Sequence, residues 1–326
     1  MSPSMAGGSP PGREPASRFA RLSSLDLMFL RVESAAWPCH FGGLAILDGP
    51  ALCDTSGRLR LGEIAGRLNR RLEHVPQFRR RVLFPGLLQG KALWVDHDRF
   101  DIHQHVRDRA VDPPGGDIEL LDAAARICGD LLDRSRPSWE LWFLTGLSGG
   151  RVGVLLKLHH SVADGMAAVM LMASLFDAGS GAPEPAVKPW APQSMPKGSQ
   201  LLLDNLATKH EDGAGAARRP RYLAGHQHAV NVEVTNVTGP PVPVYLFGAP
   251  VLAVLPIVGP VGNMGPILCA FSYAGQLFLV VTADAHGFPD LGVLMAGMEA
   301  DARALLGSHA GSAPADVRAD TPAAGR

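Results

Sequence analysis

The stretch from Val234 to Ala283 contains no Asp, Glu, Lys or Arg, and this feature constrains the fold more than any other in the chain. A membrane-spanning helix would need about 20 uninterrupted apolar residues. Prolines, which break helices, interrupt every part of the stretch. They are Pro240, Pro241, Pro243, Pro250, Pro256, Pro260 and Pro266. We therefore expect buried strands that form ordinary core, in preference to a surface that contacts lipid.

The residues after Lys197 show the patterns of strands and of a closing helix. Val230 to Val237 alternates apolar and polar residues, and Ile267 to Tyr273 pairs with Gln276 to Ala283 through the turn Ala274-Gly275. A helix is expected from about Pro289 to Gly307, with an inner stripe that contains Leu291, Leu294, Met295, Met298 and Leu305.

The N-terminal half alternates expected helices with expected strands. We expect helices over 22–33, 61–72 and 120–132, and strands over 41–47 and 151–158. In the first helix Leu25, Met28 and Phe29 share a face, and in the third Leu121, Ala124, Cys128, Leu131 and Leu132 do so. The arginine run Arg79 to Arg81 is interpreted as a solvated surface, with contact to anionic lipid or cofactor phosphate as the alternative.

Composition narrows the function and the cellular setting. Thirty Lys and Arg against 31 Asp and Glu give a net charge of -1, so we expect no nucleic-acid partner. The four cysteines form no C-x-x-C pair, which favours reduced thiols in the cytoplasm. The residues up to Ser17 lack an apolar core segment and are expected to form a disordered leader that is not a secretory signal.

The residues His159 to Gly165 concentrate the chemistry of the chain. Two histidines and Asp164 follow an expected strand, and an apolar helix is expected from Asp164 to Phe176. If strand alternation holds, His160 shares the face of Leu158, whereas His159 points to the other side. An imidazole facing a cleft can act as a general base toward a hydroxyl group, whereas Asp164 can fix the loop and Gly165 permits a close turn.

Other chemistries have less support from the sequence. A metal-dependent hydrolase could use His159, His160 and Asp164, completed by His103 and His105, but nothing in the sequence shows that these residues converge. No G-x-S-x-G motif is present for serine catalysis, and the glycines at 259, 262 and 265 have the wrong spacing for a dinucleotide loop.

His159 to Gly165 has the form H-H-x-x-x-D-G of the CoA-dependent acyltransferase superfamily. Six surrounding segments resemble, in the same order, the wax ester synthase and diacylglycerol acyltransferase branch of this superfamily. They are LSSLDLMFLRVES, CHFGGLAILDGP, WVDHDRFDIHQHV, RPSWELWFLTGL, KPWAPQSMPKGSQLLLDNLA and VTNVTGPPVPVYLFGAPV. The resemblance covers most of the chain outside its two tails.

The resemblance implies a mixed α/β fold like that of chloramphenicol acetyltransferase. It implies a disordered leader over 1–17, an N-terminal lobe over 18–177, a linker and shortened region over 178–229, a partial C-terminal lobe over 230–307 and a disordered tail over 308–326. The C-terminal lobe is expected to be truncated, because residues 206–230 are mostly polar and contain no Asn-Asp pair.

The resemblance also implies an activity. The chain would transfer a fatty acyl group from acyl-CoA, a co-substrate and not a cofactor, to diacylglycerol or a long-chain alcohol. His160 would be the base, Asp164 structural, and His159 and Gly165 supporting parts of the motif. Trp139 would shape the acyl passage or be a core aromatic, and Asn236 would line the site or fix a turn.

The expected location is the inner face of the plasma membrane or the surface of lipid inclusions, with the protein bound peripherally. Two further interpretations remain open beside the acyltransferase. One is a catalytically impaired relative that binds acyl chains or lipid without turnover, and the other is the metal-dependent hydrolase.

Overall fold

The computed structural model describes residues 18–162, 175–181, 190–208, 226–227, 229–260 and 262–309. The chain divides into one unit over Met1–Thr282 and a second over Ala283–Arg326, and each is described by itself. The second unit contributes the helix α7 (Leu291–His309), close to the expected bounds. The helix expected from Asp164 to Phe176 lies almost entirely outside the described residues.

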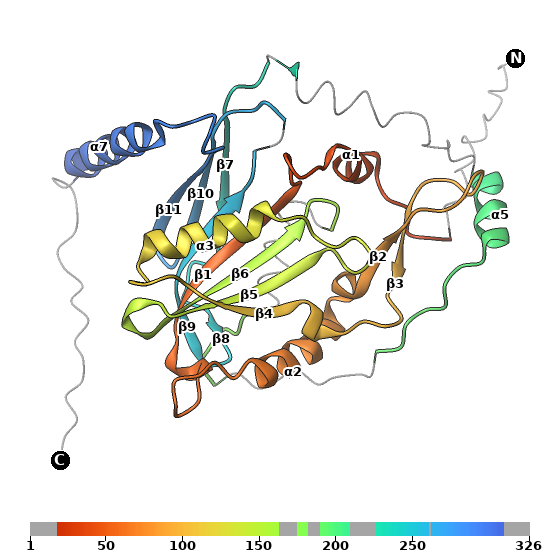
Figure 1. Cartoon of the computed structure of the whole chain (residues 1–326), viewed down its shortest axis with the longest axis horizontal. Helices are drawn as coiled ribbons and strands as arrows, with labels where there is room; N and C mark the ends of the chain where they lie inside the picture. Colours follow the sequence, from red (N-terminus) through yellow and green to blue (C-terminus); the bar gives the residue numbers. More distant parts are fainter. Residues whose placement is uncertain are drawn as a thin grey trace, which may run out of the picture. The chain divides into compact units, whose positions relative to one another are not determined.

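A mixed six-stranded sheet forms the centre of the first unit (Figure 1). Its strands, in spatial order, are β4 (Val106–Ala110), β5 (Trp139–Thr145), β6 (Arg151–His159), β1 (His40–Asp48), β9 (Ala249–Val258) and β8 (Tyr245–Leu246). The pair β4–β5 is parallel, and the other neighbours are antiparallel. The expected strands over 41–47 and 151–158 are confirmed, and β1 joins the N-terminal half to residues from the distant proline-rich stretch.

The strand β1 is buried on both faces, because it carries apolar side chains at successive positions and these point alternately to one face and the other. Leu44 and Ile46 enter a core cluster with residues of the helix α3 (Asp117–Gly129). Ala45 and Leu47 enter a larger cluster on the opposite face, with residues of the helix α2 (Leu61–Arg71). The sheet therefore lies between two apolar layers.

The helix α1 (Ser24–Val32) begins as the sequence indicates but buries a different face. Ser23 caps it, and Asp26 completes a capping box with Ser23. Its buried residues are Leu27, Leu30 and Val32, whereas Leu25 and Met28 are exposed. The expectation for α3 is confirmed only in part. Ala124 and Leu132 are buried as expected, whereas Leu121 and Leu131 are exposed. The buried face also contains Leu120, Ala123 and Ile127.

The second sheet of the first unit contains β11 (Gln276–Thr282), β10 (Ile267–Tyr273) and β7 (Glu233–Thr238), in that order. The expected hairpin is confirmed, with Tyr273 opposite Gln276. Ala274 and Gly275 both have positive φ, as a two-residue hairpin turn requires. The charge-free stretch therefore forms strands, but Val234 and Leu277 remain exposed, so only part of it is core.

A hairpin of β2 (Arg80–Leu83) and β3 (Leu93–Asp96) packs against the helix α5 (Gly198–Thr208). The expected solvated surface at the arginine run is wrong for Arg79. This side chain is buried, and its Nη2 donates to the carbonyl oxygen and Oδ1 of Asn69. Short 3-10 turns complete the described elements, at Pro50–Leu52, Leu72–His74, Pro76–Arg79, Ile102–Gln104 and Ser148–Gly150.

Within the described ranges, no helix is both long enough and apolar enough to cross a membrane.

Candidate active site

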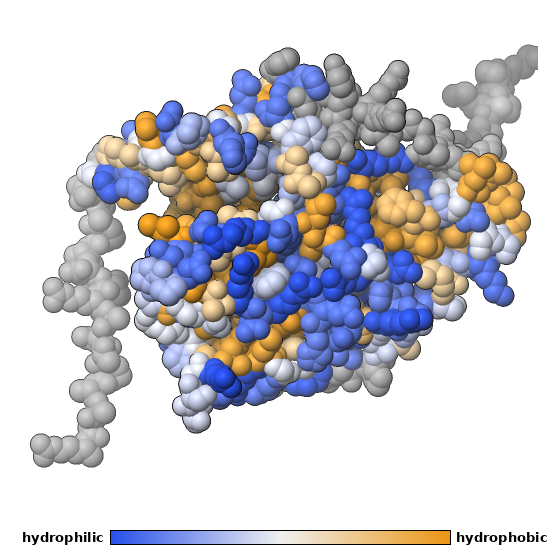
Figure 2. Space-filling model, viewed as in Figure 1, coloured by the Kyte–Doolittle hydropathy of each residue, from blue (hydrophilic) through white to orange (hydrophobic). Residues whose placement is uncertain are grey.

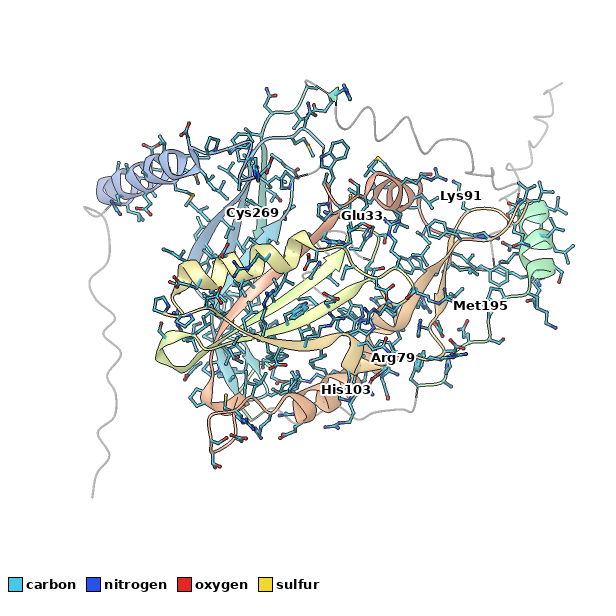
Figure 3. All side chains as sticks on the ribbon, in the orientation of Figure 1. Glu33, Arg79, Lys91, His103, Met195 and Cys269 are labelled. Atoms are coloured by element: carbon cyan, nitrogen blue, oxygen red, sulfur yellow. The ribbon has the colours of Figure 1, made fainter. Side chains whose placement is uncertain are left out.

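A cavity of about 320 Å³ lies between the paired strands β1 and β9 of the large sheet and the strands β7 and β10 of the second sheet. Strand alternation explains its lining, because every second residue of a strand points to the same side. The residues that line it are Phe41, Gly42, Gly43, His160, Phe176, Glu233, Thr235, Val237, Pro240, Val244, Val254, Pro256, Val258, Cys269, Phe271 and Tyr273. Cys269 is labelled on β10 in Figure 3. The walls are mainly apolar, which suits a hydrocarbon chain.

His160 lies at this cavity, directly after the end of β6. Its ring stacks on Phe29 with a centroid separation of 4.6 Å and contacts Phe41 at the same separation. Its backbone N–H donates to the carbonyl oxygen of Cys39. Burial lowers the pKa of His160 to about 4, and His159 and His40 add to the lowering. The imidazole is therefore neutral at pH 7, as a proton acceptor must be.

His159 points away from the cavity and is buried completely. The backbone N–H of Ser161 donates to Nδ1 of His159, and the Ser161 hydroxyl lies 2.7 Å from the same nitrogen. In the neutral ring Nδ1 is therefore the acceptor, and Nε2 carries the hydrogen. Nε2 lies 3.4 Å from Oε1 of Glu33. The expected division of the two histidines between opposite sides agrees with this geometry.

Glu33 is the centre of a buried polar cluster that the sequence analysis missed. Its Oε1 also lies 2.9 Å from Nε2 of His40, and its Oε2 accepts hydrogen bonds from Nε and Nη2 of Arg134. Burial raises the pKa of Glu33, but the contacts with His159, His40 and Arg134 outweigh burial and hold that pKa well below its usual range. Glu33, labelled in Figure 3 just after α1, is therefore a buried carboxylate anion.

The other expected site residues are distributed as follows. Asp164 and Gly165 lie outside the described residues. Trp139 is buried in the larger core cluster, where its Nε1 donates to the carbonyl oxygen of Phe78, and it is not among the residues that line the cavity. Asn236 is exposed on β7, and its neighbours Thr235 and Val237 face the cavity instead.

The histidines proposed to complete a metal site do not join His159 and His160. His105 is buried, stacks between Phe100 and Trp139, and has Nδ1 2.9 Å from the carbonyl oxygen of Trp139. His103 is exposed. Among the residues with described positions, no group of three or more His, Cys, Asp or Glu is arranged to hold a metal ion.

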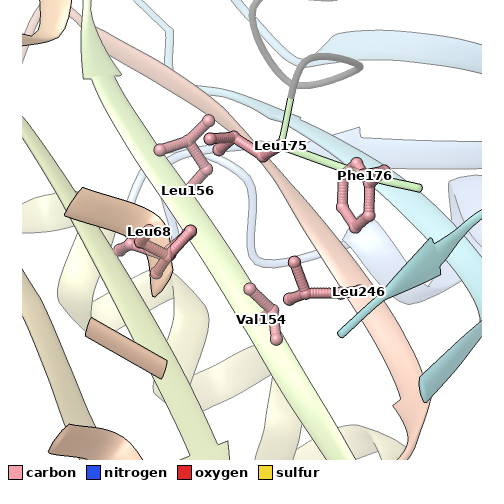
Figure 4. Close-up of a pocket in the computed structure, with 7 residues that line it drawn as sticks. Leu68, Val154, Leu156, Leu175, Phe176 and Leu246 are labelled. Atoms are coloured by element: carbon pink, nitrogen blue, oxygen red, sulfur yellow. The ribbon is translucent and has the colours of Figure 1, made fainter. Parts of the chain in front are cut away.

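Phe176 separates the active-site cavity from a second, very small void. The void measures about 10 Å³ and is shown in Figure 4. Its lining is entirely apolar and consists of Leu68, Leu141, Val154, Leu156, Leu175, Phe176 and Leu246. The next residue, Asp177, holds this segment in place, because Nη2 of Arg71 donates to both of its carboxylate oxygens. Phe176 therefore forms part of the wall of both spaces.

Comparison with protein families gives two matches. The model of the wax ester synthase/diacylglycerol acyltransferase catalytic domain matches residues 22–239. The model of the WS/DGAT C-terminal domain matches residues 202–305. Both parts of the family are thus recognisable in this chain, including the region that the sequence analysis expected to be truncated.

Individual relatives agree with these matches. A putative diacylglycerol O-acyltransferase of Mycobacterium tuberculosis is 36% identical over 168 residues, which cover 51% of this chain and 32% of that protein. A probable diacylglycerol O-acyltransferase of the same organism is 31% identical over 183 residues, with coverage of 56% and 66%. The chain thus spans less than two thirds of the length of these relatives.

Among solved structures, the wax ester synthase/diacylglycerol acyltransferase of Marinobacter aquaeolei aligns with a TM-score of 0.65 at 17% identity. The alignment covers 86% of this chain and 97% of that chain. The two proteins share a fold, which confirms the mixed α/β architecture expected from the sequence.

Proposed function

Because the chain belongs to the wax ester synthase/diacylglycerol acyltransferase family, we propose that it transfers a fatty acyl group from acyl-CoA to an alcohol. The acceptor is the free hydroxyl of diacylglycerol or of a long-chain alcohol, and the product is triacylglycerol or wax ester. Acyl-CoA is consumed as a co-substrate. The observation that carries the proposal is that His160 faces a largely apolar cavity of about 320 Å³.

The reaction needs a base that is neutral before the attack. His160 accepts the proton of the hydroxyl as the oxygen attacks the thioester carbonyl carbon. When the tetrahedral intermediate collapses, the carbon–sulfur bond breaks and the imidazolium returns the proton to the sulfur of CoA. The low pKa of His160 keeps the ring unprotonated at pH 7, so its nitrogen is available to accept the proton.

The surroundings of His160 fix its ring for this role. Phe29 and Phe41 contact the ring, and the hydrogen bond to Cys39 holds the backbone. Behind it, the anionic Glu33 holds His159 and favours positive charge in this region. We therefore assign His160 as the base and Glu33 and His159 as positioning residues. Asp164 stays a predicted structural residue of the loop, with Gly165 as its turn.

The cavity suits the acyl chain of the donor, because its walls present Val237, Val254, Val258 and Phe271. Among the described lining residues Glu233 is the one carboxylate. Since both the acyl chain and the acceptor are lipids, we propose that the protein acts at the surface of a membrane or of a lipid inclusion.

A thiol-release assay tests the proposed reaction. Purified protein is given palmitoyl-CoA with either hexadecanol or dipalmitoylglycerol, and both free CoA and ester are measured. His160→Gln is expected to lower the rate by about a hundredfold to ten-thousandfold while the fold survives. His103→Gln, at an exposed histidine, is the matched control and keeps full activity.

The same assay distinguishes the alternative function, a protein that binds acyl chains without turnover. The cavity alone would serve that function equally well. Equal affinity for a fluorescent fatty acid in wild type and His160→Gln, with no CoA released by either, would favour this alternative. Unchanged ester formation by His160→Gln would exclude His160 as the base.

A further inference from the structure

The tip of the β2–β3 hairpin exposes large apolar side chains to solvent. Leu87 is 82% exposed, and Phe84 and Leu88 are both more than half exposed. The adjoining helix α5 adds Leu203 and Leu206 on its outer side, while Leu201, Asp204, Asn205 and Thr208 face inward. We call these five exposed residues the hairpin surface. Figure 2 shows hydrophobic surface over α5 and the hairpin tip beside it.

The backbone at this tip is strained. Leu88 has φ of 65°, a conformation that is unfavourable for a side chain of this kind. Gly or Asn would adopt it more easily, and neither would present an apolar side chain. Strain of this sort persists where the surrounding structure enforces it and is common at functional sites.

Several hydrogen bonds hold the tip in place. Nη1 of Arg21 donates to the carbonyl oxygens of Gln89 and Lys91, at 2.9 and 2.7 Å. Nδ2 of Asn205 donates to the carbonyl oxygen of Leu88, which ties the tip to α5. The side chain of Gln89 accepts from the backbone N–H of Gly86. The leucines are therefore presented by a fixed scaffold.

The charged groups beside the hairpin surface are mainly positive. A groove of about 220 Å³ runs between the hairpin and α1, and Arg31 and Lys91 line it. Lys197, just before α5, is also exposed. The neighbouring acids are engaged elsewhere, because Asp26 caps α1 and Asp204 is buried in an ion pair with Arg21.

We propose that the hairpin surface docks on an anionic lipid layer, with its leucines inserted among the acyl chains and Arg31, Lys91 and Lys197 facing the lipid phosphates. Apolar side chains with cations beside them match the layered chemistry of such a surface. A second copy of the chain would instead bring the same cations against each other. The helix α1 connects this surface to the active site, since Arg31 borders the groove and Phe29 stacks on His160.

The role of the lipid layer as a source of substrates rests on the proposed function. Binding of the protein to vesicles is measured without turnover. The full chain is mixed with vesicles of phosphatidylcholine, with or without phosphatidylglycerol, and sedimented without acyl-CoA. We expect binding to vesicles that contain phosphatidylglycerol, weakened by added salt. Leu87→Asp is expected to lower the partition coefficient by about tenfold or more.

Three variants separate docking from general damage to the fold. Ile118→Asp, at a residue 79% exposed on α3, is the matched control and leaves binding unchanged. Leu88→Gly relieves the strained backbone, so it keeps or raises the thermal midpoint yet weakens vesicle binding severalfold. Lys91→Glu combined with Lys197→Glu abolishes the preference for phosphatidylglycerol.

The outcomes also separate docking from catalysis. His160→Gln is expected to bind vesicles like wild type, and Leu87→Asp is expected to keep turnover of short, water-soluble substrates. Equal binding of wild type and Leu87→Asp would overturn the proposal. A concentration-dependent dimer that Leu87→Asp dissociates, without vesicle binding, would overturn it in favour of a second copy.

Discussion

Glu33 and His159 meet in the protein interior, with Oε1 of the carboxylate 3.4 Å from Nε2 of the imidazole. Both side chains are almost completely buried. The contact joins Glu33, directly after α1, to His159, which precedes His160 in the sequence. The same helix also supplies Phe29, whose ring stacks on His160.

Removing the charge of Glu33 is expected to weaken both the fold and the activity. Glu33→Gln leaves Arg134 without its anionic partner and removes the negative charge beside His159. Because the Arg134 side chain is 37% exposed, solvent offsets part of the lost contact, and we expect a cost of about 1–3 kcal/mol. Thermal unfolding measures this cost, and the control Glu299→Gln, in the exposed pair with Arg303, costs about 1 kcal/mol or less.

The catalytic rate of Glu33→Gln tests its positioning role. If Glu33 orients His159 and thereby His160, the variant lowers kcat at a temperature where it remains folded, and KM changes little. A folded variant with wild-type kcat would restrict Glu33 to a structural role.

The stability of the fold is expected to decrease as the pH falls from about 6.5 toward 4. Burial lowers the pKa of His160 and that of His105 to about 4, from the ordinary value of 6.5. Between these values the unfolded chain binds protons that the folded chain does not, so acid favours unfolding. Thermal midpoints across this range measure the effect. His160→Phe, which keeps an aromatic ring beside Phe29, should reduce the slope; an unchanged slope would contradict the assignment for His160.

Shortening Phe176 is expected to change the preferred length of the acyl donor. Phe176 lies in the wall of both the active-site cavity and the small apolar void, so Phe176→Ala joins the two spaces. The variant should prefer longer acyl-CoA substrates, measured as relative rates in a mixture of chain lengths. Phe176→Leu keeps most of the wall and is the control. The same chain-length profile in all three proteins would remove Phe176 as a determinant of length.

Two glycine substitutions are expected to have opposite effects on stability. A Cβ on Gly42 would lie 1.9 Å from the carbonyl oxygen of Leu156, so Gly42→Ala forces β1 and β6 apart at the edge of the cavity. We expect a large loss of stability, measured by thermal unfolding. Gly66, inside α2, has open space around it, and Gly66→Ala should stabilise the protein by about 0.5–1 kcal/mol. Equal effects of the two changes would contradict the close packing at Gly42.

The sequence was sufficient to predict those elements whose signal is local. The hairpin of β10 and β11 follows from strand patterns on either side of Ala274-Gly275, and the existence of α1 follows from the spacing of apolar residues over 22–33. The placement of His160 at a cavity also follows from the alternation along β6. In each case the decisive residues are neighbours in the sequence.

Features that depend on distant contacts were missed or mistaken. Glu33, His40 and Arg134 reach His159 only through the fold, and an acid directly after a helix gives no sign that it is buried. The apolar residues of α1 fit two overlapping faces, and packing of Leu27 and Leu30 decided between them. Arg79 looked solvated because the sequence does not show that Asn69 satisfies its guanidinium group inside the protein.

The position of β1 between β6 and β9 has a consequence for how the protein is made. Leu44 pairs on one side with Leu155 and on the other with Leu255, so both partners are synthesised after it and the partner from β9 comes last. Until the ribosome has released β9, that side of β1 remains an open strand edge, which can pair with other chains. We expect slow folding and a dependence on chaperones during translation, because pairing across so long a loop is slow.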